Sequence, residues 1–482
     1  MYDLRPVVSV IGRLTMILGA SMLVPMALDW ADGSENWRCF ALSAFLALSM
    51  GQMFVLVTRR GGDTGLSRQQ AFLLTALVWV ALPLFGCLPF MLGAPGADFT
   101  DAFFEAMSGL TTTGATVFTG LDGSERGMLL WRALLQWYGG VGIVVVAMVF
   151  LPVLKIGGMQ FFRSEAFDLS SDILPRAAEV AGSLFWIYLA LTVACMLGYS
   201  AAGMEGFDAL CHAMTTVATG GFANYDASFG AFAPAVHYVA AVFMALAALP
   251  FIRFIELSRG DPAPLARDPQ VRAFLVLVIG IAAVVALWIV LVNGRGAEEG
   301  ARHALFNILS IITGTGYASE NFSAWGGFPV TVFFIVALIG GCTGSTSCSA
   351  KVFRYQILFA ALAQQIRRIH NPSGVFPLRY AHRVVEPEVV SSVMAYFFIF
   401  VTALAAWAML LSLFGLDAVT SISGSVAALT NIGPGLGPEI GPAGTYAGLP
   451  DGAKWLLSAG MVLGRLEFLS ILVLLTPHFW QR

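Results

Sequence analysis

Four short stretches rich in threonine and glycine recur along this chain at near-regular intervals, and each ends in glycine. They are Thr111-Thr112-Thr113-Gly114, Ala218-Thr219-Gly220-Gly221, Thr313-Gly314-Thr315-Gly316 and Thr430-Asn431-Ile432-Gly433. We call them Thr/Gly segments 1 to 4. Glycine turns the backbone in directions that other residues rarely adopt, and a ring of inward carbonyls can replace the hydration shell of K+. Four copies in one polypeptide therefore predict four turns around a single ion.

The composition restricts the chain to a membrane protein. Of its 482 residues, 58% are hydrophobic and 11% are charged, whereas a soluble domain has about 25% charged residues. Many apolar runs reach the roughly 20 residues that cross a ~30 Å hydrocarbon layer. The net charge of −3 indicates no basic surface for nucleic acid. We therefore expect an all-α protein that lies in a lipid bilayer.

The apolar runs repeat one order of elements. Two leading spans precede four units, and each unit consists of a span, a short re-entrant segment that carries a Thr/Gly segment, and a second span. The leading spans are expected at 7–29 and 39–58, and the unit spans at 70–93, 128–153, 181–203, 233–257, 272–293, 327–366 (with a break inside), 390–414 and 452–476. The re-entrant segments are expected at 100–118, 207–224, 302–319 and 419–436. They are too short to span, and such backbone is tolerated only where it lines water or is buried.

These elements divide the chain into five parts around one central pore. The parts are a leading segment 1–65 and pore units 66–165, 166–265, 266–385 and 386–482. Arginine and lysine gather in every second loop, which is typical of cytoplasmic loops. The positive loops contain Arg59, Arg60 and Arg68; Lys155, Arg163 and Arg176; Arg253, Arg259, Arg267 and Arg272; and Lys351, Arg354, Arg367, Arg368, Arg379 and Arg383. Both termini are therefore expected inside, and all four Thr/Gly segments toward the outside.

The Thr/Gly segments contain neither carboxylate nor lysine, whereas filters for divalent cations or anions usually carry charged rings. Backbone carbonyls, helped by threonine hydroxyls, are the expected ligands for a large monovalent cation. The expected K+ ligands are Thr112, Thr113, Thr219, Gly220, Gly314, Thr315, Asn431 and Ile432. Segment 4 is the least regular, so the ring should be asymmetric and less selective than one of four identical subunits. For a single segment, helix packing through small residues is the alternative.

An unbroken run of small residues interrupts the second span of the third unit. The small-residue loop, Gly340–Ala350, contains Gly340, Gly341, Cys342, Thr343, Gly344, Ser345, Thr346 and Ser347. Glycine, serine and threonine weaken helices, so a flexible flap that obstructs the pore is predicted, with a close helix crossing as the alternative. Arg465 lies in the last apolar run beside Glu467. An intramembrane charge normally faces a water path or a partner, so Arg465 either acts on this gate or forms a salt bridge with Glu467 or a neighbouring helix.

Together these features resemble the Trk/Ktr/HKT potassium transporter superfamily, and most closely its bacterial TrkH-type uptake subunits. The resemblance rests on the Thr/Gly segments, the small-residue loop, Gly139-Gly140-Val141-Gly142 with Leu151-Pro152, and Gly464-Arg465-Leu466-Glu467 ahead of Thr476-Pro477. It implies four filter glycines at Gly114, Gly221, Gly316 and Gly433, an intramembrane gating loop at Gly340–Ala350 and a gate arginine at Arg465. The loop departs from the family pattern at Ser347-Cys348-Ser349-Ala350, which leaves the energetics of gating open.

The resemblance also implies a homodimer in the bacterial inner membrane and a cytosolic nucleotide-binding subunit that forms a ring of the TrkA type below the pore. Potassium is then the transported ion, and no organic cofactor is expected in this chain, which has no GxxxxGK[ST] phosphate loop. Gly114 favours K+, because a serine at the first filter glycine accompanies Na+ transport in plant relatives. A Na+-permeable or mixed transporter remains the alternative.

A membrane-embedded enzyme with a site at Asp208, His212 and His303 is a further alternative. It is disfavoured because the equivalent positions Asp101, Glu105, Asn307 and Gly424 show no common chemistry. Capping of the pore helices, or charge for an outer vestibule, is the expected role of these polar residues.

Overall fold

The computed structural model describes residues 3–59, 67–146, 173–381 and 383–480 as an almost wholly helical protein. Two unit boundaries, at 65/66 and 165/166, fall outside these residues, as do Arg60, Lys155, Arg163 and Leu151-Pro152. The leading segment consists of α1 (Arg5–Ser21), α2 (Leu23–Ala31) and α3 (Trp37–Thr58). Helices α1 and α3 cross closely at Gly12 and Gly51, where an added Cβ on Gly12 would lie 2.8 Å from the Gly51 carbonyl oxygen.

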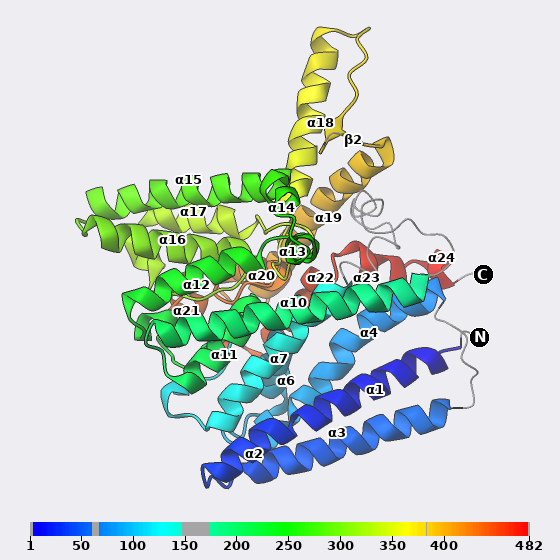
Figure 1. The fold of residues 1–482 in the computed structure, drawn as a ribbon, viewed down its shortest axis with the longest axis vertical. Helices are drawn as coiled ribbons and strands as arrows, with labels where there is room; N and C mark the ends of the chain where they lie inside the picture. The colour runs from blue at the N-terminus through cyan, green and yellow to red at the C-terminus, as the bar shows by residue number, and fades with distance from the viewer. Residues whose placement is uncertain (1–2, 60–66, 147–172, 382, 481–482) are drawn as a thin grey trace.

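The four units follow in the expected order (Figure 1). Unit 1 contains α4 (Arg68–Gly86), α5 (Leu88–Leu92), α6 (Phe99–Leu110), η1 (Leu121–Gly123) and α7 (Arg126–Val145). Unit 2 contains α10 (Ile173–Ala201), α11 (Gly206–Val217), η4 (Ser228–Ala231), α12 (Pro234–Ala247) and α13 (Phe251–Ser258), and α14 (Ala263–Arg267) leads to the next unit. Unit 3 contains α15 (Pro269–Leu291), α16 (Ala297–Thr313), η5 (Phe322–Trp325), α17 (Gly327–Ala337), α18 (Val352–His370), β1 (Arg379–Tyr380) and β2 (Arg383–Val384). Unit 4 contains α19 (Pro387–Ser412), α20 (Ala418–Thr430), α21 (Gly437–Ile440), η6 (Tyr446–Gly448), α22 (Asp451–Arg465), α23 (Leu469–Leu474) and α24 (Pro477–Trp480).

Seven helices or helix pairs in the described residues are long and apolar enough to cross a membrane. They are Arg5–Ala31, Trp37–Thr58, Gln69–Leu92, Arg126–Val145, Ala181–Ala201, Pro269–Leu291 and Pro387–Ser412. The other three predicted spans are the second spans of units 2, 3 and 4, and each is broken. The break in unit 3 was predicted, whereas the prediction of continuous spans at 233–257 and 452–476 is wrong.

The two unexpected breaks have local causes. Helices α12 and α13 meet at 94°, and Pro250, which has no backbone N–H, lies between them and caps α13. Helices α22 and α23 are separated at Glu467 and Phe468, whose φ angles of 55° and 30° cannot continue a right-handed helix. Each break therefore interrupts an apolar run that the sequence predicted as one helix.

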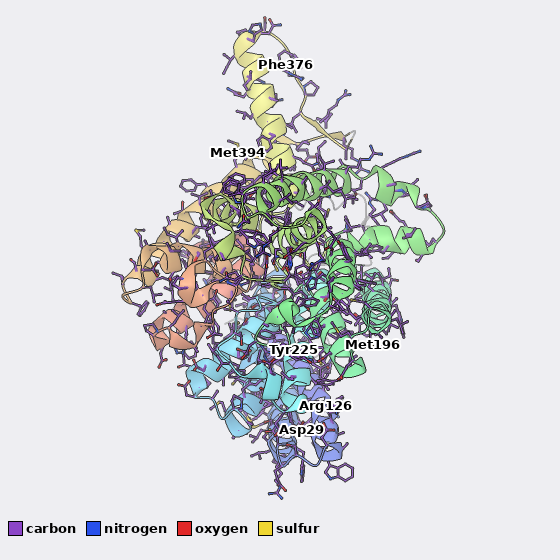
Figure 2. All side chains as sticks on the ribbon, turned by 90° about the vertical axis from the view of Figure 1, so that its left-hand side faces the viewer. Asp29, Arg126, Met196, Tyr225, Phe376 and Met394 are labelled. Carbon is purple, nitrogen blue, oxygen red and sulfur yellow. The ribbon has the colours of Figure 1, made fainter. Side chains whose placement is uncertain are left out.

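The four re-entrant helices α6, α11, α16 and α20 each end at a Thr/Gly segment. Carboxylates begin two of them, because Asp98 accepts from the Asp101 N–H at 2.8 Å and Asp417 from the Val419 N–H at 2.9 Å. Figure 2 looks from the left-hand side of Figure 1 and shows the blue-cyan, green, yellow-green and orange parts of the chain around a common centre. The predicted architecture of two leading helices and four repeated units is confirmed.

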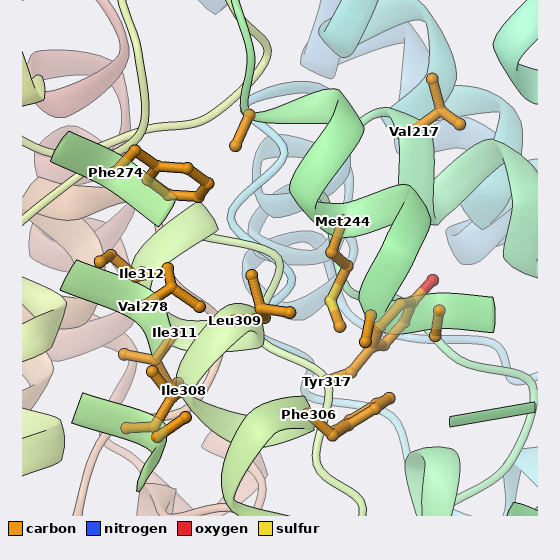
Figure 3. Packing of buried hydrophobic residues seen from close by; sticks show 14 of the residues in the cluster. Val217, Met244, Phe274, Val278, Phe306, Ile308, Leu309, Ile311, Ile312 and Tyr317 are labelled. Atoms are coloured by element: carbon orange, nitrogen blue, oxygen red, sulfur yellow. The ribbon is translucent and has the colours of Figure 1, made fainter. Parts of the chain in front are cut away.

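Apolar packing holds the re-entrant helices against the spans. Ile308, Ile311 and Ile312 of α16 belong to one buried cluster with Phe274 and Val278 of α15 (Figure 3). Both ends of the described chain contact the start of α4, since Gln70 donates to the Asp3 carbonyl at 2.7 Å and Gln69 to the Phe479 carbonyl at 3.3 Å. The first and last helices therefore begin and end on the same side of the molecule.

Candidate ion-conduction site

Each pore helix ends in a left-handed turn at the second residue of its Thr/Gly segment. The φ angles are 52° at Thr112, 49° at Thr219, 79° at Gly314 and 52° at Asn431. The N–H of each of these residues bonds to the carbonyl three positions earlier, at 3.0 to 3.4 Å. Such turns usually use glycine, and a β-branched threonine there is strained. The sequence interpretation missed this position because it looked for conformational freedom at the final glycine.

The final glycines place the four segments side by side. Gly114, Gly221 and Gly316 have φ angles of 83°, 81° and 83°, whereas Gly433 is outside the left-handed region. An added Cβ on Gly114 would clash with the Gly220 carbonyl oxygen, and one on Gly221 would clash with the Thr315 carbonyl oxygen.

The remaining two contacts close the ring. A Cβ on Gly316 would lie 2.9 Å from the Gly433 nitrogen, and one on Gly433 would lie 2.8 Å from the Gly114 carbonyl oxygen. Segments 1, 2, 3 and 4 thus contact one another in cyclic order. At Gly433, the approach of segment 1 excludes a side chain, whereas backbone conformation alone would permit one.

The side chains behind the ring differ between segments. Thr111 and Thr113 share a hydroxyl hydrogen bond of 2.8 Å, and so do Thr313 and Thr315. Segments 1 and 3 therefore have the same support on opposite sides of the ring.

Segment 2 has no such threonine pair, and Gln136 of α7 occupies the space instead. Its Nε2 donates to the Gly220 carbonyl at 2.6 Å, and its Oε1 accepts from the Phe222 N–H at 3.0 Å. In segment 4, Asn431 Nδ2 donates to Thr113 Oγ1 at 3.0 Å and to the Met461 carbonyl at 2.9 Å. Two quarters of the ring are thus held by amide side chains, and the surroundings of the ring are asymmetric.

A cavity of about 220 Å³ lies directly above the ring. All four final glycines line it, together with Pro434, Tyr446 and the polar residues Arg132, Tyr225 and Asp226. Tyr225 donates to Asp208 at 2.7 Å, and this hydrogen bond raises the pKa of Tyr225 to about 12. The cavity is a vestibule that ends on the four segments.

One hydrogen bond recurs in all four units. It holds the segment that follows each Thr/Gly segment against the pore helix of the same unit. Each time, the backbone N–H three residues after the final glycine donates to a side chain of the pore helix. The pairs are Val117 to Glu105 at 2.9 Å, Asn224 to His212 at 3.3 Å, Ser319 to Asn307 at 3.2 Å and Leu436 to Ser423 at 2.9 Å. The expectation that these positions share no chemistry is wrong for Glu105, His212 and Asn307, because all three side chains are acceptors. In unit 4 the acceptor is one residue before Gly424, and this shift concealed the pattern.

These contacts also account for the residues of the alternative enzyme site. Both ring nitrogens of His212 are engaged, one by the Asp208 carbonyl at 2.8 Å and the other by the Asn224 N–H. His303 bonds to Ser319 at 2.7 Å, and Asp101 is paired with Lys454 at 2.5 Å. Asp208, His212 and His303 therefore hold loops and pore helices.

In unit 1 the acceptor belongs to a buried ion pair. Arg132 Nε lies 2.8 Å from Glu105, and Arg132 also donates to the Ala223 carbonyl of unit 2 at 2.8 Å. Both side chains are buried. The ion pair thus holds together the two chain segments that follow the ring in units 1 and 2.

Replacing Glu105 with Ala is expected to lower the free energy of unfolding by about 3–5 kcal/mol, because Arg132 remains buried without its partner. Glu35→Ala is the matched control, since the Glu35–Arg38 pair is exposed and contributes little. Chemical denaturation of both variants in the same micelles measures the difference. Equal losses of stability in the two variants would contradict a structural role for the buried pair.

The small-residue loop lies directly below the ring. A Cβ added to Gly314 would meet the Cys348 Cβ at 3.2 Å, and Thr112 Oγ1 lies 3.8 Å from Cys348 Sγ. The loop is anchored at its ends, where the Gly340 N–H donates to the Ala350 carbonyl at 2.8 Å, and at Thr346, whose hydroxyl bonds to the Val217 carbonyl at 3.1 Å. The small-residue loop is therefore not helical, as predicted, and it lies under segments 1 and 3.

Arg465 ends α22 beside this loop and is buried. Its guanidinium donates to Cys348 Sγ at 2.7 Å and to the Gly139 carbonyl at 3.1 Å, and it lies 5.6 Å from the centre of the Trp79 ring. Glu467, the alternative partner, pairs with Arg354 at 2.5 Å. A positive charge is thus held next to the loop, below the ring.

The chain matches a known family over most of its length. The TrkH family model, described as a cation transport protein, matches residues 40–482. The chain belongs to the TrkH family. It is 41% identical over 479 residues to the Trk system potassium uptake protein TrkI of Halomonas elongata, with 99% of this chain and 97% of the relative covered. It is 35% identical to the Trk system potassium uptake protein TrkH of Escherichia coli K12, with 99% of both chains covered.

The fold agrees with a solved TrkH structure. The crystal structure of the potassium transporter TrkH from Vibrio parahaemolyticus superposes with a TM-score of 0.91 at 33% sequence identity, with both chains wholly covered. This TrkH family member is therefore a multi-pass membrane subunit of the Trk type, and it is a transport protein and not an enzyme.

Proposed function

We propose that this TrkH family member conducts K+ into the cell through the ring of four Thr/Gly segments. The observation that carries the proposal is the closed ring of four glycines at the floor of the vestibule. The ring contains no carboxylate, so only backbone carbonyls and hydroxyls are available as ligands, which suits a large monovalent cation. The relatives from Halomonas elongata and Escherichia coli are potassium uptake proteins, in agreement with this chemistry.

The proposed K+ ligands are the eight residues predicted from the sequence, two in each segment. Within this set, the Gly220 carbonyl also accepts from Gln136, and Asn431 bonds to Thr113. These bonds hold the ligands in place in two of the four segments. The proposed ring is therefore only partly symmetric, and selectivity lower than that of a channel with four identical subunits follows from it.

The small-residue loop and Arg465 form the proposed gate. The loop crosses under segments 1 and 3, and Arg465 adds a positive charge that repels a cation leaving the ring. Moving one charge inward is favoured by about 2.3 kcal/mol per 100 mV of inside-negative potential. An open gate is thus sufficient for uptake without ATP hydrolysis in this subunit.

The proposed setting is the bacterial inner membrane, with both termini cytoplasmic and with a cytosolic ring of nucleotide-binding subunits of the TrkA type that moves the gate. The proposed pore units are 66–165, 166–265, 266–385 and 386–482, after the leading segment 1–65. Contact of both described chain ends with the start of α4 supports a common side for the termini.

A homodimer is part of the proposal, and α18 supplies the surface that supports it. This helix projects from the body of the molecule (Figure 1) and ends near Phe376 (Figure 2). Phe359, Leu362, Ile366 and Ile369 follow one another at helical spacing and are 56–73% exposed. An apolar stripe of this kind favours burial against a second copy.

Replacing Leu362 and Ile366 together with Glu is expected to convert the dimer into monomers, because two charges would enter the apolar contact. Val375→Glu is the control, since Val375 is 91% exposed and lies outside the stripe. Light scattering of the purified proteins in detergent measures the mass. A dimer that persists in the double variant would show that the interface lies elsewhere.

The function itself is tested by Rb+ uptake into liposomes that contain the purified chain, with K+ or Na+ as competitor. K+ should suppress Rb+ uptake far more strongly than Na+. Equal suppression would support the alternative of a mixed K+/Na+ transporter. Addition of the cytosolic nucleotide-binding subunit tests gating in the same vesicles, and no change in flux would remove that partner from the proposal.

A further inference from the structure

An apolar cavity of about 270 Å³ lies between α1, α4 and the C-terminal half of α7. Its walls include Leu14 and Ile17 of α1, Trp79 of α4, and Gly142 of α7. The hydroxyl of Tyr138, another wall residue, is engaged by Ser21. The cavity thus presents mainly hydrocarbon to whatever fills it.

We propose that this cavity binds an acyl chain of a membrane lipid, which packs against two groups that hold Arg465 of the proposed gate. Apolar cavities of ~150 Å³ take up benzene and stay free of water, so this larger one suits a hydrocarbon chain. Water requires polar partners, and these walls offer few.

The cavity is continuous with the surface that faces the bilayer. Ile17 lines the cavity and is 60% exposed, so one wall residue belongs to both surfaces. Only 39% of an 18-residue apolar stretch of the α1–α2 span is buried within the protein. Because α1 crosses the membrane, the molecules that meet this opening are lipids, and their chains are the apolar groups available there.

Trp79 connects the cavity with the proposed gate. Its ring is 6% exposed and lines the cavity, and the Arg465 guanidinium lies 5.6 Å from the ring centre. Gly139, a second wall residue, accepts from Arg465 through its carbonyl at 3.1 Å. Two groups that hold Arg465 therefore form part of the wall, and an occupant that packs against them limits their movement away from it.

Tryptophan quenching by lipids with brominated acyl chains tests the proposal. The full-length protein and Trp79→Phe are reconstituted in brominated and in ordinary phosphatidylglycerol vesicles, and the difference between the two proteins isolates the emission of Trp79. Strong quenching of this difference is expected. If Trp79 emission is the same in both lipids, the proposal is overturned.

A variant that fills the cavity separates an internal chain from lipid outside. A Cβ at Gly142 would meet only the Trp79 ring, at 3.9 and 4.0 Å, so the side chain of Gly142→Leu has room to enter the cavity. Quenching of Trp79 should fall by more than half in this variant and remain unchanged in Gly280→Leu, whose added Cβ meets nothing within 4 Å.

Quenching of the other tryptophans reports whether the variants remain folded. Leu14→Phe fills the cavity from α1 and replaces Gly142→Leu if that variant is misfolded. Undiminished quenching in a folded, filled variant overturns the proposal.

Discussion

Replacing Gly114 with Ser is expected to reduce the preference for K+ over Na+ by about tenfold, which corresponds to 1.4 kcal/mol. Gly114 has a φ of 83°, and its Cβ would clash with the Gly220 carbonyl oxygen. The ring must therefore change where segments 1 and 2 meet, and displaced carbonyls no longer match K+. Rb+ uptake into liposomes at several K+ and Na+ concentrations measures the ratio.

Gly123→Ser is the matched control for this change. Gly123 lies in the same unit, and an added Cβ there meets nothing within 4 Å. Both variants should remain folded, because the substitution at Gly114 affects a local contact at the ring. An unchanged ion preference in Gly114→Ser, with the protein intact, would show that the ring does not select the ion.

Replacing Arg465 with Ala should raise the basal K+ flux, in the absence of any regulator, on the order of a thousandfold. A unit charge about 4 Å from a passing cation costs ~4 kcal/mol at an effective dielectric constant of 20, and the variant removes this barrier. It also frees Cys348, to which Arg465 donates at 2.7 Å. Stopped-flow efflux from liposomes with the purified chain alone measures the rate.

Arg465→Lys keeps the charge and separates repulsion from packing. Its basal flux should remain close to that of the unchanged protein, although the contacts with Gly139 and Trp79 are altered. If Ala and Lys raise the flux equally, shape holds the gate closed and charge does not. If neither raises it, Arg465 is not part of the gate.

The sequence predicted the architecture well because its signals were long. Apolar runs and their repeated order located the two leading helices and the four units. The breaks after α12 and α22 were missed because Pro250 and the Glu467–Phe468 pair are single local features inside apolar runs. Such features bend a helix without changing the hydropathy that predicts it.

The site was predicted less completely than the fold. The four glycines were found because glycine is distinctive in sequence. The left-handed turns at Thr112 and Thr219 were not found, because threonine rarely adopts them and only the surrounding structure holds it there. The recurring acceptors Glu105, His212, Asn307 and Ser423 were missed because a carboxylate, an imidazole, an amide and a hydroxyl do the same work.

The contact of segment 4 with segment 1 sets an order for biogenesis. Gly433 lies against the Gly114 carbonyl, and Asn431 bonds to Thr113, so residues from the first and last units close the ring. A nascent chain that has not yet released its last unit from the ribosome has only three sides of this ring. The ring can therefore close only after the final unit has been inserted.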